Sequence, residues 1–149
     1  MREILFRGKD NISGEWITGF LVDERRIGNW LLCTPVHPDT VGQFTGLTDK
    51  NGKKIFEGDV VRQTFEKSVP LFASSWGSDG YEDICGDDVG AVVIIPSKGV
   101  CIKNPIIHRE VDGEITQHGE KAKMYKPVCS SRCEVIGNIH DNPELLEGA

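Results

Sequence analysis

The chain has 149 residues, a formal charge of −6 and a pI near 5.2. That length predicts one domain, expected to span residues 1–149, with a core of ordinary size. The acidic balance argues against a general nucleic-acid binder, because nonspecific affinity for phosphate comes from clustered Lys and Arg. Val and Ile number 27 against 12 Leu and Ala, and this excess of β-branched residues predicts a mostly β fold.

No apolar segment is long enough for export or for a membrane span. The N-terminus has only three consecutive apolar residues, at 4–6, before the next charge, whereas a secretory signal needs roughly 7–15 and a membrane span about 20. The five cysteines are an odd number without the spacing of a disulfide framework. We therefore expect a cytoplasmic protein with reduced thiols and no membrane partner.

The first strong strand pattern covers residues 16–22. One face carries Trp16, Phe20 and Val22, and the other carries mainly aliphatic residues. Because both faces are apolar, we expect a strand that is buried on both sides or lies at an interface. A further strand is expected over residues 27–32.

Two glycine-containing pairs mark hairpins. The Asn-Gly pair at 51–52 lies between apolar flanks and predicts a type I′ turn, which needs positive φ at both central positions. The Asp-Gly pair at 112–113 predicts a second hairpin, between strands at 106–111 and 114–117.

The C-terminal segment predicts a strand followed by a short helical turn. Residues 133–139 alternate weakly, as a strand does. Asn142 is then placed to cap a turn over 143–146, with Pro at its first position and an acid in its first turn.

Residues 65–89 show no convincing periodicity and predict a long insertion without regular structure. Such loops are usually functional or disordered. This one holds Phe72, Trp76 and Tyr81, and five acids but no base between residues 79 and 88. We interpret the three aromatic residues as candidate interaction residues. For Trp76 we favour a contact, either with its own domain or with a neighbouring subunit, over ligand stacking.

Segments at both ends and in the middle of the chain resemble the YopX family, proteins of unknown function encoded mostly by bacteriophages and prophages. They cover residues 4–9 and 14–19, then 40–61, and finally 134–146. The resemblance implies a small, mostly β fold with an SH3-like barrel, additional N-terminal strands, and self-association in the cytoplasm of a bacterial host. It brings no catalytic residues and no cofactor, and the segment 65–89 departs from it, because a shorter connection is expected there.

Cysteines and histidines offer one candidate metal site. Cys129 and Cys133 are separated by three residues, a spacing that structural zinc sites permit. Cys101, His108 and His118 are the possible partners. No second compact pair exists, so we favour packed thiols over a metal site.

The same thiols are candidates for nucleophilic catalysis, with Cys133 or Cys129 activated by His140. Cys133 and His140 are seven residues apart along an expected strand, so they would point to opposite faces. The sequence therefore predicts no enzyme, although a cryptic Cys/His enzyme remains an alternative.

An acidic segment and a basic segment suggest two different ligands, a cation and a nucleic acid. The acids at 79–83 and 87–88 suggest Ca²⁺, but their spacing does not match an EF-hand, and we favour a solvated loop. Lys121, Lys123 and Lys126 form a basic patch beside an aromatic residue, and this is the only support for a nucleic-acid-binding barrel. We favour an edge strand whose lysines discourage aggregation.

These observations predict a phage- or prophage-derived accessory protein that is not an enzyme and that acts through protein contacts. We expect a homo-oligomer, with a host or phage protein as a possible partner, and no bound cofactor or metal.

Overall fold

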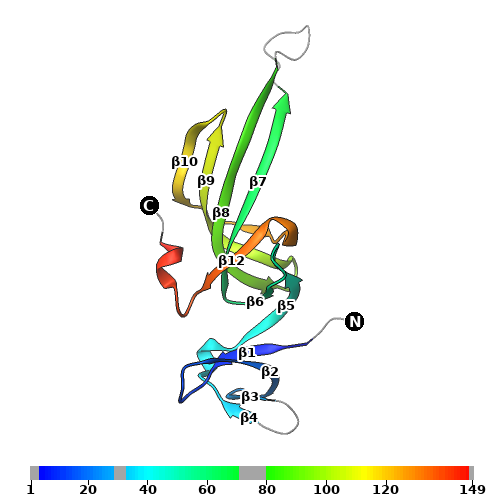
Figure 1. The fold of residues 1–149 in the computed structure, drawn as a ribbon, viewed down its shortest axis with the longest axis vertical. Helices are drawn as coiled ribbons and strands as arrows, with labels where there is room; N and C mark the ends of the chain where they lie inside the picture. The colour runs from blue at the N-terminus through cyan, green and yellow to red at the C-terminus, as the bar shows by residue number, and fades with distance from the viewer. Residues whose placement is uncertain (1–3, 29–32, 71–79, 148–149) are drawn as a thin grey trace.

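The computed structural model describes residues 4–28, 33–70 and 80–147, which form two antiparallel β-sheets arranged along the long axis of the molecule (Figure 1). The predicted mostly β class is confirmed. The strands are β1 (Phe6–Lys9), β2 (Trp16–Asp23), β3 (Arg26–Gly28), β4 (Cys33–Pro35), β5 (Gly42–Thr48), β6 (Lys54–Phe56), β7 (Asp59–Pro70), β8 (Tyr81–Ile95), β9 (Gly99–Val111), β10 (Glu114–Lys121), β11 (Tyr125–Pro127) and β12 (Cys133–Asn138). Short 3₁₀ helices lie at η1 (Pro38–Thr40), η2 (Ser130–Arg132) and η3 (Pro143–Leu146).

The first sheet has the strand order β4-β3-β2-β1-β5-β6. Its small core contains Ile27 and Val36, which are 0% and 2% exposed. A Cβ on Gly8 would lie 3.0 Å from Val36 Cγ2, so glycine lets β1 pack closely over this core.

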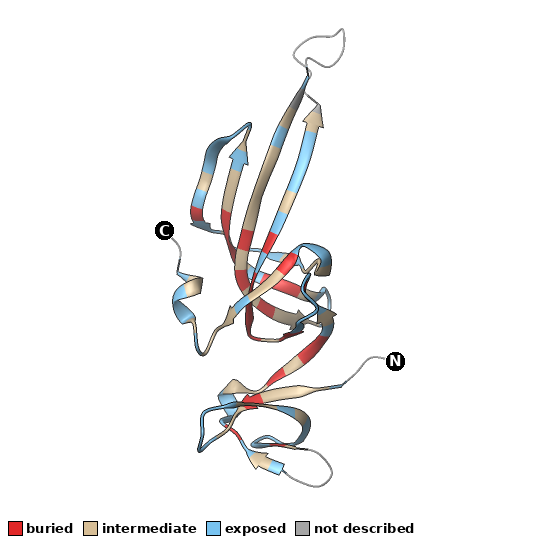
Figure 2. Cartoon of the chain, viewed as in Figure 1, coloured by how far each residue is buried: buried red, intermediate tan, exposed pale blue. Residues whose placement is uncertain are grey.

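The second sheet has the order β10-β9-β8-β7-β12, and β11 also pairs with β9. The main core lies at its base, where Figure 2 shows most of the buried segments. It contains Ile55, Val61, Val92, Ile102 and Cys133, all fully buried. Because Ile55 belongs to β6 of the first sheet, this core also holds the two sheets together.

Strands β7 and β8 form a long hairpin that projects past the end of β9 and β10 (Figure 1). Their pairing is continuous from Val60↔Ala91 to Pro70↔Tyr81. The prediction of an irregular insertion is therefore wrong for residues 65–70 and 81–89. The outer parts of β7 and β8 extend beyond the core. They have no buried face, so their sequence has no alternating apolar pattern.

The turn at Asn51-Gly52 differs from the predicted type I′ turn. Gly52 has a φ of 84°, but Asn51 is not in the positive-φ region. The Asp49 side chain organises the turn instead, because its Oδ1 accepts hydrogen bonds from the backbone N–H groups of Asn51 and Lys53, each at 2.9 Å. This is an Asx-type arrangement, which releases Asn51 from the need for a positive φ.

The hairpin at Asp112-Gly113 is confirmed. The two residues have φ values of 50° and 83°, as a type I′ turn requires. They connect β9 to β10, which pair through Val111↔Glu114.

The C-terminal turn is a 3₁₀ helix of four residues, η3. Asn142 occupies the N-cap position but makes no side-chain capping hydrogen bond. Its Oδ1 instead accepts from the N–H of Asn138 at 3.3 Å, so its side chain supports the bend that follows β12.

The strand order of the described residues shows that the SH3-like barrel expected from the resemblance is not formed. Each sheet runs from one edge strand to another without returning to its first strand, so the described part of the chain forms two open sheets and no closed barrel. The reason is the length of the central strands: β7 and β8 have 12 and 15 residues and extend past their neighbours, which leaves β10 and β12 at opposite edges.

Candidate functional site

A cluster of charged and aromatic side chains joins the two sheets. Arg7 of β1 lies 2.6 Å from Asp59 Oδ1 of β7, and the two side chains are only 12% and 2% exposed. The Arg7 guanidinium carbon lies 4.6 Å from the centre of the Trp16 ring and 4.9 Å from that of Phe56. One counterion and two aromatic faces therefore hold a buried cation between the sheets.

Asp59 has a second partner within the turn that precedes β7. Its Oδ2 accepts a hydrogen bond from the N–H of Phe56 at 2.8 Å. Burial raises the pKa of Asp59, and the positive charge of Arg7 acts in the opposite direction. These contacts assign Asp59 to the junction between the sheets, because both carboxylate oxygens are used within the protein.

Asp141 ties the segment after β12 to the first sheet. Its carboxylate accepts from Asn138 Nδ2 at 3.0 Å and from Trp16 Nε1 at 2.8 Å, and it pairs with Lys9. Hydrogen bonds from Asn138, Lys9 and Trp16 hold the pKa of Asp141 well below its usual range. The N- and C-terminal segments are thus connected through one carboxylate.

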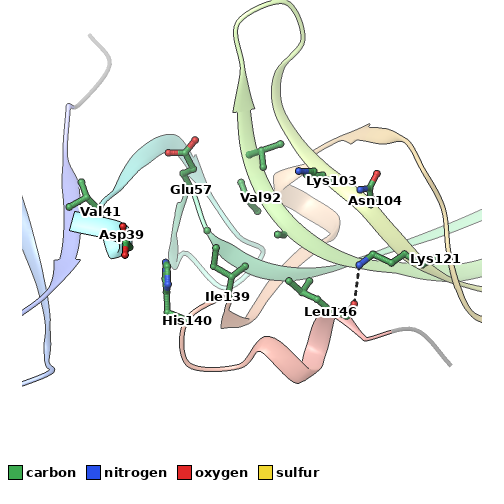
Figure 3. Close-up of a pocket in the computed structure, with 13 residues that line it drawn as sticks. Asp39, Val41, Glu57, Val92, Lys103, Asn104, Lys121, Ile139, His140 and Leu146 are labelled. Atoms are coloured by element: carbon green, nitrogen blue, oxygen red, sulfur yellow. Dashed lines mark hydrogen bonds between the residues drawn. The ribbon is translucent and has the colours of Figure 1, made fainter. Parts of the chain in front are cut away.

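A cleft of about 510 Å³ lies beside this junction (Figure 3). The Lys121 ammonium donates to the carbonyl of Leu146 at 3.2 Å at one side of the cleft. Burial, and then the charge of Arg7, lower the pKa of His140, which favours the neutral imidazole. The polar lining residues are Asp39, Glu57, Lys103, Asn104, Lys121 and His140.

The charged residues that line this cleft are of both signs. Acids and lysines are mixed, so the cleft presents no single charge to a ligand. Its described lining residues include no cysteine, serine, threonine or tyrosine beside His140.

The structure does not bring the cysteine and histidine candidates together. Cys133 begins β12 and Cys101 lies in β9, both buried. His108 and His118 contact each other, Nδ1 to Nδ1, at 3.1 Å. Within residues 4–28, 33–70 and 80–147, no three His, Cys, Asp or Glu side chains are placed to hold a metal ion together.

The two neighbouring thiols have opposite properties. Hydrogen bonds from Ser131 and Arg132 lower the pKa of Cys129 to about 7. Burial, with the negative charge of Asp49, raises the pKa of Cys133 to about 12. Cys129 lines a pocket with η2, whereas His140 lines the inter-sheet cleft, so this structure does not pair the ionisable thiol with the proposed base.

The acidic segment is not a solvated loop. Asp88 lies in β8 and is 3% exposed. It accepts from Arg109 Nη2 at 2.9 Å and from Lys126 Nζ at 3.1 Å. Asp83, by contrast, is exposed and accepts from Ser68 Oγ at 2.6 Å across the hairpin. Asp83 and Asp88 therefore lie along one strand with protein partners and do not surround a Ca²⁺ site. Asp79 lies outside the described residues.

The predicted basic patch is divided by the same contacts. Lys126 is paired with Asp88, and Lys121 donates to the carbonyl of Leu146. Lys123 is exposed. The three lysines therefore do not present a continuous cationic surface to a phosphate backbone.

The aromatic candidates of the hairpin are only partly within the described residues. Phe72 and Trp76 lie outside them, and Tyr81 begins β8. Their predicted role in contacts stays a prediction.

Consecutive apolar side chains of β2 are exposed to solvent. Phe20, Leu21 and Val22, which we name the β2 strip, are 58%, 40% and 50% exposed. Phe20 and Leu21 are adjacent and point to opposite faces of the sheet, so apolar surface is uncovered on both sides. Val22 lies at a register irregularity between Leu21 and Asp23. The prediction of a strand buried on both sides is therefore wrong for this end of β2, and the interface alternative for residues 16–22 stays a prediction.

Sequence reasoning missed Arg7 and Asp59 as a pair. Both lie in segments that resemble the family, which is the signal that could have found them. Their separation of 52 positions hides the contact, because no local spacing rule connects β1 with β7.

The described residues define a class: a protein of two open antiparallel sheets held together by a buried ion pair. None of its described helices has the length and apolar character needed to cross a membrane. The family model described as "YopX protein" matches residues 6–147, so the chain belongs to the YopX family. A comparison with curated proteins finds no match.

Proposed function

We propose that this chain is a non-catalytic, self-associating interaction module, encoded by a phage or prophage and acting in the cytoplasm of the bacterial host. The observation that carries the proposal is the β2 strip. Burying one Phe, Leu or Val side chain stabilises a contact by about 1.5–3 kcal/mol relative to leaving it exposed. A large exposed apolar side chain such as Phe20 forms a suitable centre for an interface.

The charges next to the strip favour a second copy of the chain as the partner. Residues 23–26 carry two acids followed by two arginines, and Asp23 pairs with Arg26. In a twofold contact, each acidic end would face the arginines of the other copy, which is how an isologous interface becomes self-complementary. A polar rim around an apolar centre is the usual anatomy of such contacts.

The described side chains give less support to the other candidate functions. Two of the three lysines expected to contact nucleic acid are engaged, Lys126 by Asp88 and Lys121 by the carbonyl of Leu146. The thiol with a lowered pKa lines a different pocket from His140. We therefore favour protein contacts over both nucleic-acid binding and cysteine catalysis.

Sedimentation velocity at tens of micromolar tests the proposal with a matched pair of variants. Phe20→Glu places a charge in the strip, and Ile115→Glu places the same charge at another exposed position, 66% exposed on β10. We expect wild type and Ile115→Glu to sediment as oligomers and Phe20→Glu to sediment as a 16.5 kDa monomer. A monomeric wild type would contradict self-association, and an unchanged Phe20→Glu oligomer would contradict the location.

A further inference from the structure

Two histidines face each other across neighbouring strands of the second sheet. His108 of β9 and His118 of β10 are direct cross-strand partners, so their side chains share one face. The Nδ1 atoms are 3.1 Å apart and the rings are inclined at 61°. The pairing register shifts between His118 and Glu120, and this irregularity lies directly beside the second histidine.

The distance between the two nitrogens suits shared coordination of one ion. Imidazole nitrogens bind Zn²⁺ at about 2.0–2.1 Å, so two ligands of one ion lie roughly 2.9 Å apart at a right angle and about 3.3 Å apart in a tetrahedron. The observed 3.1 Å between His108 and His118 falls between these values. The same distance also permits a single hydrogen bond, in which one neutral ring donates and the other accepts.

The surroundings of the pair favour a cation. The histidines line a cavity of about 550 Å³ whose other charged groups are three carboxylates and one guanidinium. The guanidinium, Arg62, is already paired with Glu134 at 3.3 Å. The carboxylates belong to Asp87, Glu144 and Glu147.

Asp87 adds an independent observation. It is the cross-strand partner of His108 on β8, so Asp87, His108 and His118 form one row over three strands. Its Oδ1 is buried and has no hydrogen-bond partner among the described residues. A buried carboxylate oxygen without a donor is costly, and a nearby cation or its coordinated water supplies the missing partner.

We propose that His108 and His118 bind one divalent transition-metal ion of the zinc and copper type through their Nδ1 atoms. Water completes its coordination, since no third described side chain lies close enough to make a preformed three-ligand site. The site is accessible, because His118 is exposed and His108 is partly exposed. Affinity follows the usual order for imidazole ligands, with Cu²⁺ above Zn²⁺.

Calorimetric titration with Zn²⁺ alone tests the site in the full chain. We expect one ion per chain for wild type, and binding weakened roughly tenfold or more in His108→Ala and in His118→Ala, because each loses the chelate. His37→Ala is the matched control, since His37 is exposed at the N-cap of η1 and its removal leaves binding unchanged. Circular dichroism confirms that each variant is folded.

A second measurement separates histidine from thiol ligation. Titration is repeated after alkylation of the accessible cysteines, and histidine ring ¹⁵N shifts are recorded with and without Zn²⁺. Retained binding with shifts of His108 and His118 supports the proposal. No saturable binding means that the pair is only hydrogen-bonded, and binding that disappears with the thiols assigns the ion to cysteine, so either result overturns it.

Discussion

Replacing Arg7 with Met removes the cation from the junction while keeping the length of the side chain. Asp59 then remains buried, with its side chain 2% exposed and without its counterion at 2.6 Å. Breaking a buried ion pair by removing one partner costs about 3–5 kcal/mol. For a chain of this size that corresponds to a fall in Tm of about 10 °C.

The stability that Arg7→Met loses should depend on pH in a defined direction. Burial already raises the pKa of Asp59, with Arg7 opposing the shift, so removing Arg7 raises this pKa further. A carboxyl group whose pKa is higher in the folded state contributes stability that is fully present below its unfolded pKa of about 4, and that contribution disappears as pH rises through the folded pKa. The difference between Arg7→Met and wild type is therefore largest at pH 7–8 and smallest near pH 4.

Urea denaturation followed by tryptophan fluorescence, repeated from pH 4 to pH 8, measures both effects. Arg62→Met is the matched control, because Arg62 pairs with Glu134 at 3.3 Å with its side chain 47% exposed. An exposed pair contributes at most about 1 kcal/mol. The reasoning is refuted if Arg7→Met costs no more than Arg62→Met, or if its cost is the same at pH 4 and pH 8.

Three other predictions follow from single residues. Cys129 should react with iodoacetamide with a midpoint near pH 7, while Cys133, whose pKa is raised to about 12, should stay unmodified in the folded protein; peptide mapping that finds Cys133 labelled first contradicts this. Asp141→Asn should be less stable than wild type above pH 4, and this difference in unfolding free energy should disappear as pH falls, because the pKa of Asp141 is lowered in the folded state. Urea titrations that give the same difference at every pH contradict this. Gly86→Ala should destabilise the fold by more than about 3 kcal/mol, because its Cβ would lie 1.9 Å from the carbonyl oxygen of His108; an unchanged Tm contradicts this.

Local sequence rules predicted the elements whose determinants are themselves local. The Asp112-Gly113 turn follows from two residues that both adopt positive φ, and its hairpin is present. The geometry of the Asn51-Gly52 turn was not predicted, because the rule considers only the two central residues and leaves out Asp49. Asp49 accepts from the N–H of Val135 at 3.0 Å as well, so this turn is fixed partly by a strand 86 residues away.

The long hairpin was missed for a different physical reason. Periodicity reports burial, and the outer part of β7 and β8 has little to bury: Glu66, Lys67 and Ser68 are all exposed. What holds the arms together is backbone pairing, which uses main-chain groups that nearly all residue types share. Such strands leave no pattern in the sequence.

Charged residues at the candidate sites were the hardest to predict, because a run of charged residues in the sequence is usually interpreted as solvent-exposed. Asp88 was interpreted as part of a solvated acidic run, and Lys126 as part of a basic patch, yet they neutralise each other with Arg109 in the second sheet. The pairing connects three strands, β8, β9 and β11. Only the register of the sheet brings these side chains together.

The segments that resemble the family converge on the junction between the sheets. Arg7 and Trp16 come from the first two segments, Asp59 from the central one, and Asp141 from the last. Their contacts are with one another, so what makes the chain recognisable is the way in which its two sheets are joined. A binding surface needs groups that the fold leaves uncommitted. The β2 strip, just beyond the segment at 14–19, and the histidine pair, outside all the segments, meet that condition better than the junction does.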